Sequence, residues 1–481
     1  MTPRNAKKPE ESGFHFPRLS KEKCRKIHEA GLEILERTGV RLFLDEAVRL
    51  IKKAGAQVED GNLVRVPSRL VERALKTAPK RVVLYDREGN PAMPVEKHRC
   101  FFGPGSDCLN ILDHRSGHRR EPLVQDVIEG VILCDALTNI DFVMSMFLPS
   151  DVDGTLADRY QMEAMLSHTT KPIIYVAYEI EGCRDAVKMA EAVMGGEKAL
   201  REKPVAACYI NAVSGLRHNQ EALEKLLFLS EKNLPAIYIP ASTAAITSPV
   251  TPAGSVALDY AGFLVGLVLS QLVREGAPVI ASGMPPGGTF DMRTLVTSYC
   301  EPERTITQAL AHFNSLPMFA LGGASEAKTT DQQAAAEAAL SLVVEALAGS
   351  NIIHDLGYLE GGLTFSFVQL VLCDEIVSWI KAYTQEFDVN EETLALDVIA
   401  DVGPDGEFLG TDHTLRHYRD RWYPTLLERE TYEAWMKKGG KSFGERAQEK
   451  IESILARHKP QPLPRKVKED IRKIIREAEK G

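Results

Sequence analysis

The chain repeats one two-part unit eight times between residues 101 and 388, a short apolar run followed by a longer stretch with helical spacing. The apolar runs begin near residues 101, 140, 172, 204, 235, 278, 317 and 351. Strands that are apolar on both faces and alternate with helices predict a parallel sheet buried between helices. Eight such units predict an α/β fold of the (β/α)₈ TIM-barrel type. A doubly wound open sheet is the alternative, but its G-x-G-x-x-G turn does not occur in the sequence.

Two of the stretches between the runs are of special interest. "MRTLVTSYCEPERTITQALAHFN" predicts one helix over residues 292–314. "YAGFLVGLVLSQLV", residues 260–273, is the most apolar stretch of the chain. It is too short to span a bilayer, so we expect a buried helix there and no membrane segment.

The sequence outside the repeated units predicts three regions. Residues 1–97 are predicted to be an N-terminal helical region that ends in a short β-like segment, and residues 98–388 form the barrel. Residues 389–481 are a C-terminal extension with charged helices, in which "KPQPLP" predicts an extended linker. We expect the last, highly charged helix to be solvated or to dock on the rest of the molecule.

Charge and cysteine usage narrow the class of protein. The net charge of −9 over 481 residues gives no basic footprint for a nucleic-acid partner. The N-terminus, "MTPRNAKKPEESG", lacks the apolar region of a secretory signal. The eight cysteines form no C-x-x-C pair, which favours reduced thiols over a disulfide framework or a zinc site. We therefore expect a cytoplasmic protein.

In a barrel of this type the functional residues follow the carboxyl ends of the strands. The residues at these positions are rich in tyrosine, phenylalanine and carboxylates. Aromatic faces with acids suit a methylated ammonium, which cannot donate a hydrogen bond. Aromatic residues at strand ends are, however, also common as plain core.

Three other motifs were weighed. His413 and His417 have i, i+4 spacing but no HExxH pattern, so capping or packing is favoured and no metal site is predicted. Lys328 after the seventh strand could form a Schiff base, although an exposed lysine at a helix entry is the simpler interpretation. No G-x-S-x-G nucleophile motif is present.

Several long motifs resemble the trimethylamine methyltransferase family. They are "FFGPGSDCLNILD", "LGGASEAKTTDQQAAAEAAL", "ALAGSNIIHDLGYLEGGLTFSFVQLVLCDEI" and "DVGPDGEFLGTDHTLRHYRDRWYP". The resemblance covers roughly residues 20 to 458. It implies a TIM barrel that moves a methyl group from a methylated amine to Co(I) of a corrinoid. This cobalamin is carried by a cognate corrinoid protein, and none is expected to be bound permanently on this chain.

The sequence departs from the founding family members at one position. These members use pyrrolysine near the seventh strand, which corresponds approximately to residues 325–332. Here the segment contains standard residues, among them Ser325, Glu326 and Lys328. A quaternary ammonium already bears the charge that makes an amine a leaving group, so it needs no such side chain. The resemblance therefore implies a non-pyrrolysine member similar to a glycine betaine methyltransferase.

Alternatives remain open at this point. Proline betaine or a carnitine-like compound could replace glycine betaine as the donor. A Schiff-base barrel lyase and a non-catalytic quaternary-amine binder are the other two hypotheses. The family often forms homo-oligomers, so we expect one here.

Position at the strand ends yields the candidate site residues. We predict that Glu360 balances charge or orients the donor, and that His354 donates a hydrogen bond to a betaine carboxylate. Glycines around the barrel end would admit the corrinoid. The predicted substrate-binding residues are Tyr178, Tyr209, Asn211, Tyr358, Phe365 and Phe367, and the glycines are Gly103, Gly105, Gly283, Gly322 and Gly323.

Overall fold

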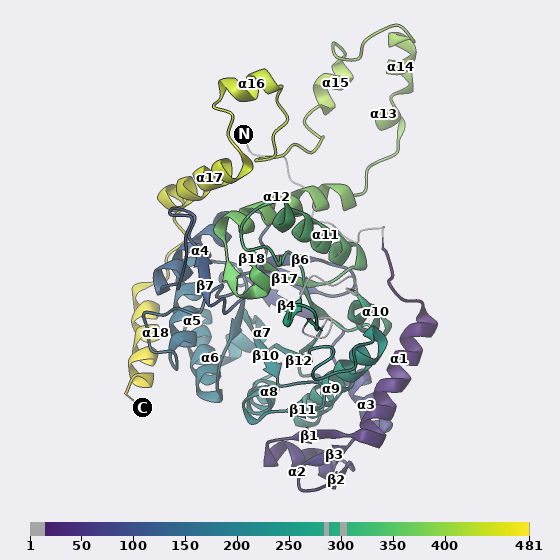
Figure 1. Cartoon of the computed structure of the whole chain (residues 1–481), viewed down its shortest axis with the longest axis vertical. Coiled ribbons are helices and arrows are strands. Elements are labelled where there is room, and N and C mark those ends of the chain that lie inside the picture. Colours follow the sequence, from purple (N-terminus) through teal and green to yellow (C-terminus); the bar gives the residue numbers. More distant parts are fainter. Residues whose placement is uncertain (1–14, 283–287, 299–304, 481) are drawn as a thin grey trace.

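The computed structural model describes residues 15–282, 288–298 and 305–480 (Figure 1). At its centre is a seven-stranded parallel sheet with the order β6-β17-β16-β13-β12-β10-β9. Each strand falls on one of the predicted apolar runs. They are β6 (Phe101–Pro104), β9 (Ile173–Val176), β10 (Ala206–Ala212), β12 (Ala236–Pro240), β13 (Val279–Ser282), β16 (Met318–Leu321) and β17 (Ile352–Leu356).

The remaining predicted run, residues 140–150, lies between the two edge strands. Asp141 N donates to Phe102 O at 2.6 Å on the β6 side, and Met146 N donates to Gly105 O at 3.0 Å. On the β9 side, Ile174 N donates to Val143 O at 2.9 Å. The segment is too irregular to form a continuous β-strand. It nevertheless forms backbone hydrogen bonds with both edge strands, as closure of a barrel requires. The (β/α)₈ prediction is confirmed.

Helices surround the sheet, and all but the short α7, which was not predicted, lie at the predicted positions. They are α4 (Val124–Ala136), α5 (Ala157–His168), α6 (Ile180–Met194), α7 (Glu197–Glu202), α8 (Gln220–Lys232), α9 (Pro252–Val273), α10 (Ile306–Phe313), α11 (Gln332–Ala348) and α12 (Phe367–Thr384). The single helix predicted over 292–314 is wrong. A hairpin of β14 (Thr289–Asp291) and β15 (Val296–Ser298) occupies its start, where the β-branched residues Val296 and Thr297 favour a strand.

The barrel is filled by side chains and closed at its amino end. Alternate residues such as Ile237 and Ile239, or Phe319 and Leu321, point into one apolar cluster. The hairpin of β4 (Val82–Tyr85) and β5 (Pro91–Val95) contributes Leu84 and other residues to the same cluster. The hairpin also bonds to Thr170 and Pro204, just before β9 and β10. Because the hairpin covers the amino end of the barrel strands, we expect the functional site at their carboxyl end.

The N-terminal region contains more strand than predicted. Its helices are α1 (Lys21–Glu33), α2 (Asp45–Lys53) and α3 (Ser68–Thr77), and a π-helical turn, Ile34–Thr38, follows α1. A small sheet in the order β11-β1-β3-β2 joins them. Its strands are β1 (Val40–Leu42), β2 (Gln57–Glu59), β3 (Leu63–Arg65) and β11 (Arg217–His218). Because β11 follows a barrel strand and the β4–β5 hairpin packs inside the barrel, the boundary at residue 97 stays a prediction.

The C-terminal region consists of two parts. Helices α17 (Phe443–Arg457) and α18 (Arg465–Ala478) pack on the outside of the barrel, where Ile451 and Ile471 are fully buried. Four short helices between residues 391 and 437 instead project beyond the barrel (Figure 1). None of the four has a buried residue. They are α13 (Glu391–Leu394), α14 (Leu396–Val402), α15 (Asp412–His417) and α16 (Tyr432–Lys437).

Helix α9 is longer than the apolar stretch that predicted it. Its 22 residues are long and apolar enough to cross a membrane, but 83% of its most apolar window is buried inside the fold. It lies against β12 and β13 on one side and the N-terminal helices α1 and α3 on the other. This burial is typical of the core helix of a globular protein.

Lys171 stabilises the connection between α4 and residues 140–150, the segment that closes the barrel. Its Nζ donates to the carbonyl oxygens of Cys134, Leu137 and Ile140 at 2.6, 2.7 and 2.7 Å. Lys171→Met would leave these carbonyls without their donor, and we expect a loss of about 3 kcal/mol in unfolding free energy. Urea unfolding measures this loss. Lys188→Met removes a largely exposed lysine from its ion pair with Asp185, which keeps Arg159 as a partner, and should cost less than about 1 kcal/mol; equal losses from the two substitutions would contradict the assignment.

Candidate active site at the carboxyl end of the barrel

Tyr358, Asp355 and Gly105 meet where β17 and β6 leave the barrel. The Tyr358 hydroxyl donates to the Ser106 carbonyl oxygen. A Cβ added at Gly105 would lie 2.2 Å from Tyr358 Cζ and 2.4 Å from Asp355 Oδ1. Both distances are well inside van der Waals contact, so only glycine lets the phenol and the carboxylate occupy these positions.

Among the described residues, four that are not glycine have positive φ around the ends of β6 and β17. They are Asp107 (61°), Met146 (62°), Asp355 (80°) and Glu360 (55°). The left-handed region is unfavourable for residues that carry a Cβ, so the packing around them must offset the strain. Such strain clusters at sites that position functional side chains. Its occurrence after β6, in the segment between the two edge strands and at the end of β17 makes this end the candidate site.

Asp107 lies beside helix α5. Gln161 Nε2 donates to Phe147 O at 2.6 Å and reaches Asp107 Oδ1 at 3.4 Å. Burial raises the pKa of Asp107 to about 6, against the opposing effect of hydrogen bonds from Gln161 and Ser106. The carboxyl group thus changes charge close to neutral pH.

A buried charge network supports the end of β9 behind Asp107. Arg159 pairs with Asp158 at 3.0 Å and with Asp185 at 3.3 Å. Asp158 in turn accepts the backbone N–H of Tyr178 at 3.2 Å. Burial and the nearby carboxylates of Asp107 and Asp158 raise the pKa of Tyr178 well above its usual value, so its phenol stays protonated.

His354 is buried and neutral. Its Nδ1 lies 2.7 Å from Ala320 O, an acceptor, so this nitrogen carries the proton. Burial lowers the His354 pKa to about 3. Nε2 is then an acceptor, and it lies 3.1 Å from Asp355 Oδ1. With its proton on Nδ1, neutral His354 has no N–H at Nε2 for the predicted hydrogen bond to a carboxylate, and that role stays a prediction.

The structure brings three of the predicted aromatic residues to this end. Tyr178, Tyr209 and Tyr358 are all half-buried there. The ring of Tyr209 packs 5.4 Å from Phe319 and 6.1 Å from His354, measured between centroids. Asn211 is exposed at the end of β10. These residues stay predicted substrate contacts.

Phe365 and Phe367 lie in a different environment. Each has almost no exposed surface. Their rings pack 5.2 and 5.9 Å from Phe147 in edge-on geometry, which is typical of an aromatic core. The Tyr358 ring contacts Phe365 at 6.2 Å. Phe365 thus packs against Tyr358, Phe367 packs against Phe365, and the structure does not bring either phenylalanine to the open end.

Glu360 belongs to the loop between β18 (Tyr358–Leu359) and β19 (Thr364–Phe365), which contains a short 3₁₀ turn. Its Oε2 accepts from Arg119 Nε at 3.1 Å and from Thr364 Oγ1 at 2.7 Å. Arg119 comes from β8 (Arg119–Arg120), which pairs with β7 (Asn110–Leu112) in the same four-stranded sheet. Glu360 therefore already has a cationic partner, and its catalytic role stays a prediction.

The predicted glycines are buried in the structure. A Cβ at Gly103 would strike the Phe142 ring at 2.6 Å, and one at Gly322 would lie 2.8 Å from Ile353 Cγ2. Gly323 has φ of +85° and lies against Leu356. These three glycines thus allow close packing within the barrel wall, and only Gly105 lies beside the site. Gly283 lies outside the described residues.

Lys328 and the segment around it have ordinary partners. The exposed Lys328 donates its Nζ to Glu326 O at 2.6 Å. Ser325 Oγ donates to Glu337 at 2.6 Å, and Asp331 accepts the first free N–H groups of α11. An exposed lysine lacks the dry surroundings that make an amine a Schiff-base nucleophile at neutral pH.

The site includes residues that the sequence reasoning did not select. Asp107 and Asp355 stand at strand ends and belong to the carboxylates noted there from the sequence, but they were not included among the predicted site residues. Gln161 had no such signal, because it lies within a predicted helix and reaches the site through the fold.

Comparisons with known proteins identify the family to which the chain belongs. The model of the trimethylamine methyltransferase family (MTTB) matches residues 3–481. The chain belongs to the trimethylamine methyltransferase family. A family match over nearly the whole chain makes it a methyltransferase and confirms the resemblance drawn from the sequence motifs.

Family members of two named specificities are similar to this chain. The trimethylamine methyltransferase MttB of Desulfitobacterium hafniense is 33% identical over 97% of this chain and 95% of its own length. MttB of Methanosarcina barkeri is 30% identical over 98% and 97%. A glycine betaine methyltransferase of D. hafniense is 29% identical over 92% and 93%. Membership in the family therefore does not by itself identify the methyl donor of this chain.

Solved structures support the fold. The monomethylamine methyltransferase MtmB of Methanosarcina barkeri superposes with a TM-score of 0.52 over 92% of this chain and 90% of its own length. Its sequence identity is 12%. A complex of MtmB with hydroxylamine gives a TM-score of 0.53. At this identity the likeness concerns the fold alone.

Proposed function

We propose that this member of the trimethylamine methyltransferase family transfers a methyl group from a quaternary amine, with glycine betaine as the first choice, to Co(I) of a corrinoid. The corrinoid is carried by a cognate protein that docks at the carboxyl end of the barrel. The observation that carries the proposal is the gathering of Asp107, Asp355 and three tyrosines beside a neutral His354. Carboxylates and aromatic faces are the groups that hold a cation that cannot donate hydrogen bonds.

The sequence supports a quaternary donor on separate grounds. Residues 325–332, where the resemblance locates pyrrolysine, hold only standard side chains with ordinary hydrogen bonds. A tertiary amine is a poor leaving group until its nitrogen becomes cationic, whereas a quaternary ammonium leaves as a neutral amine. The similarity to a glycine betaine methyltransferase agrees with this choice.

The reaction is a displacement at carbon. The methyl carbon leaves nitrogen, both electrons of the N–C bond stay on nitrogen, and the electron pair of Co(I) forms the new Co–C bond. Products are a tertiary amine and methyl-Co(III), and no proton moves. The protein then contributes position and electrostatics. Each aromatic contact to the ammonium is worth about 0.5–2 kcal/mol.

Two more properties belong to the proposal. We expect a cytoplasmic location, because a reduced corrinoid requires a reducing compartment and the described cysteines are free thiols. We also expect a homo-oligomer, as the family resemblance of the sequence motifs implied. The non-catalytic alternative differs in one respect: it binds a betaine without methylating cobalt.

A donor panel tests the proposed reaction. The protein is mixed with Co(I) cobalamin or a corrinoid protein, and with glycine betaine, proline betaine, carnitine or choline in turn. Absorbance follows methyl-Co(III). We expect at least one betaine to react. Binding without reaction by every donor would favour the non-catalytic binder, and neither binding nor reaction would overturn the proposal.

The pKa of Asp107 predicts a pH dependence. As pH falls through about 6, Asp107 gains a proton and stops attracting the ammonium, so betaine affinity should drop by up to tenfold per pH unit. The effect on stability has the opposite sign, because a raised pKa favours the folded state at low pH and that contribution is lost as pH rises through about 6. Calorimetric titration between pH 5 and 8 measures the affinity. Asp107→Asn should bind weakly at every pH; an unchanged slope in that variant would exclude Asp107.

A further inference from the structure

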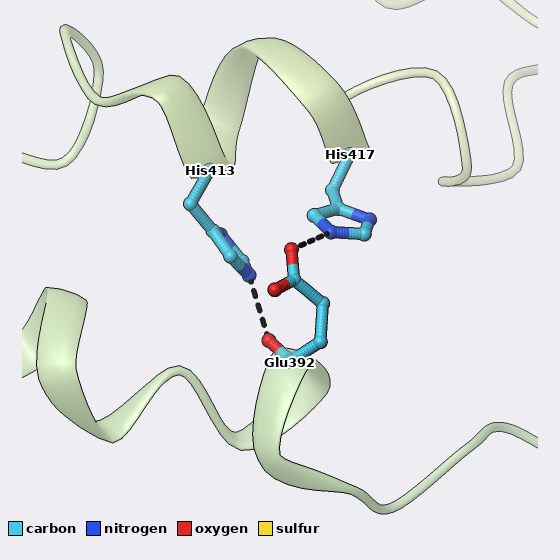
Figure 2. A group of neighbouring side chains, drawn as sticks. All are labelled: Glu392, His413 and His417. Carbon is cyan, nitrogen blue, oxygen red and sulfur yellow. Dashed lines mark hydrogen bonds and ion pairs between the residues drawn. The ribbon is translucent and has the colours of Figure 1, made fainter.

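Glu392, His413 and His417 converge in the part of the chain that projects beyond the barrel. Two of them lie one turn apart on α15, and Glu392 is on α13 (Figure 2). One ligand atom from each lies within 4.8 Å of the other two. Glu392 is 21 residues before His413, so this convergence follows from the fold and not from a motif.

The contacts within the cluster favour two imidazoles and one carboxylate around a common point. His417 Nε2 lies 3.0 Å from Glu392 Oε1, and His413 Nε2 lies 3.1 Å from the Glu392 backbone oxygen. Arg416 also contacts Oε1, at 2.8 Å. Figure 2 shows the second carboxylate oxygen on the side of His413. A metal would therefore replace the bond of His413 to the backbone and use this oxygen.

His417 already has the partner that a metal-ligating histidine requires. Its Nδ1 lies 2.8 Å from Asp420 Oδ2, so the N–H at Nδ1 faces a carboxylate. A carboxylate on the outer nitrogen fixes the orientation of the ring and leaves the other nitrogen for a metal. The His413 and His417 rings are 4.6 Å apart between centroids, and both lie on the same face of α15.

The surrounding helices show why a metal would matter. Helices α13, α14 and α15 have no buried residue, and apolar side chains such as Leu396 and Leu415 remain exposed on them. Helices this short are marginal without tertiary packing. A metal ion that joins α13 to α15 would provide the missing stabilisation, as structural metals do in small domains.

We propose that Glu392, His413 and His417 bind one first-row divalent cation, Zn²⁺ by preference, and that the ion fixes α13 against α15. Two imidazoles and a carboxylate with one open position suit Zn²⁺. The site lies outside the barrel, so it does not depend on the proposed methyl transfer. The sequence alone favoured capping or packing for the two histidines, because it does not show that Glu392 lies beside them in the fold.

The full-length protein, treated with a chelator and dialysed, is titrated with ZnCl₂ by calorimetry and with CoCl₂ by absorbance. We expect one saturable equivalent with the d–d bands of a nitrogen- and oxygen-ligated cobalt. His413→Ala, His417→Ala and Glu392→Gln should each weaken binding at least tenfold, and Asp420→Asn should weaken it about 10- to 100-fold. The control His118→Ala, at an exposed histidine elsewhere, should bind like the unmodified protein.

A second measurement tests the structural role. Limited proteolysis within residues 385–441 should slow when Zn²⁺ is added, and it should not slow in His413→Ala or His417→Ala. Absence of a saturable equivalent, or binding in both histidine variants as tight as in the unmodified protein, would overturn the proposal. A sulfur-to-cobalt charge-transfer band would place the ion on cysteines and would overturn it as well.

Discussion

Gly105→Ala is expected to reduce methyl transfer to Co(I) about 100-fold, the scale on which a displacement of about 1 Å lowers enzymatic rates. The added Cβ would lie 2.2 Å from Tyr358 Cζ and 2.4 Å from Asp355 Oδ1, so both groups must move away. The loss should appear in the initial rate of methyl-Co(III) formation with a saturating betaine.

The control for this substitution is Gly154→Ala. Gly154 has no neighbouring atom within 4 Å of an added Cβ and lacks a positive φ, so its rate should not change. Circular dichroism must show that Gly105→Ala is folded, because part of the strain could appear as lower stability. A folded Gly105→Ala variant with a rate within about threefold of the unmodified protein would contradict the assigned site.

Asp355→Asn should weaken betaine binding at least 30-fold, since removal of one partner of a buried charge pair costs about 2–5 kcal/mol. The substitution keeps the shape of the side chain and removes only the charge. Binding is measured by calorimetry with glycine betaine and with 3,3-dimethylbutyrate, in which carbon replaces the charged nitrogen. The unmodified protein should strongly prefer the charged ligand.

The ratio between these two ligands separates an electrostatic role from a structural one. In Asp355→Asn the preference for the charged ligand should largely disappear, whereas a merely structural defect would weaken both ligands alike. Asp60→Asn, at an exposed carboxylate in the N-terminal region, should keep the full preference. An unchanged ratio in Asp355→Asn would remove this carboxylate from the ammonium site. Glu360→Gln should have the smaller effect, because Arg119 already neutralises Glu360.

The barrel could be predicted from the sequence because its signal is local and repeated. Each strand is a short apolar run and each helix a longer periodic stretch, so eight repeats outweigh a single error such as residues 292–298. The small N-terminal sheet could not be predicted in the same way. It pairs Arg41 with Arg217, and a contact over such a separation leaves no periodic pattern.

The sequence could predict at which end of the barrel the candidate site lies, but not how its side chains are arranged. Strand ends indicated Tyr209, His354 and Tyr358, and the fold brings these residues to one end of the barrel, while their roles stay predictions. The sequence could not show that Phe365 faces the core, since this depends on the path of the loop after β17. Nor could it show that the His354 proton lies on Nδ1, which depends on the Ala320 carbonyl of the neighbouring strand.

The central claim is that a permanent positive charge on the donor replaces pyrrolysine in this barrel. The most direct measurement compares glycine betaine with trimethylamine in the same Co(I) assay, with the protein as the only catalyst. We predict methyl-Co(III) formation from the betaine and none above background from trimethylamine. Methylation of cobalt by trimethylamine at a rate comparable to that of the betaine would contradict the claim.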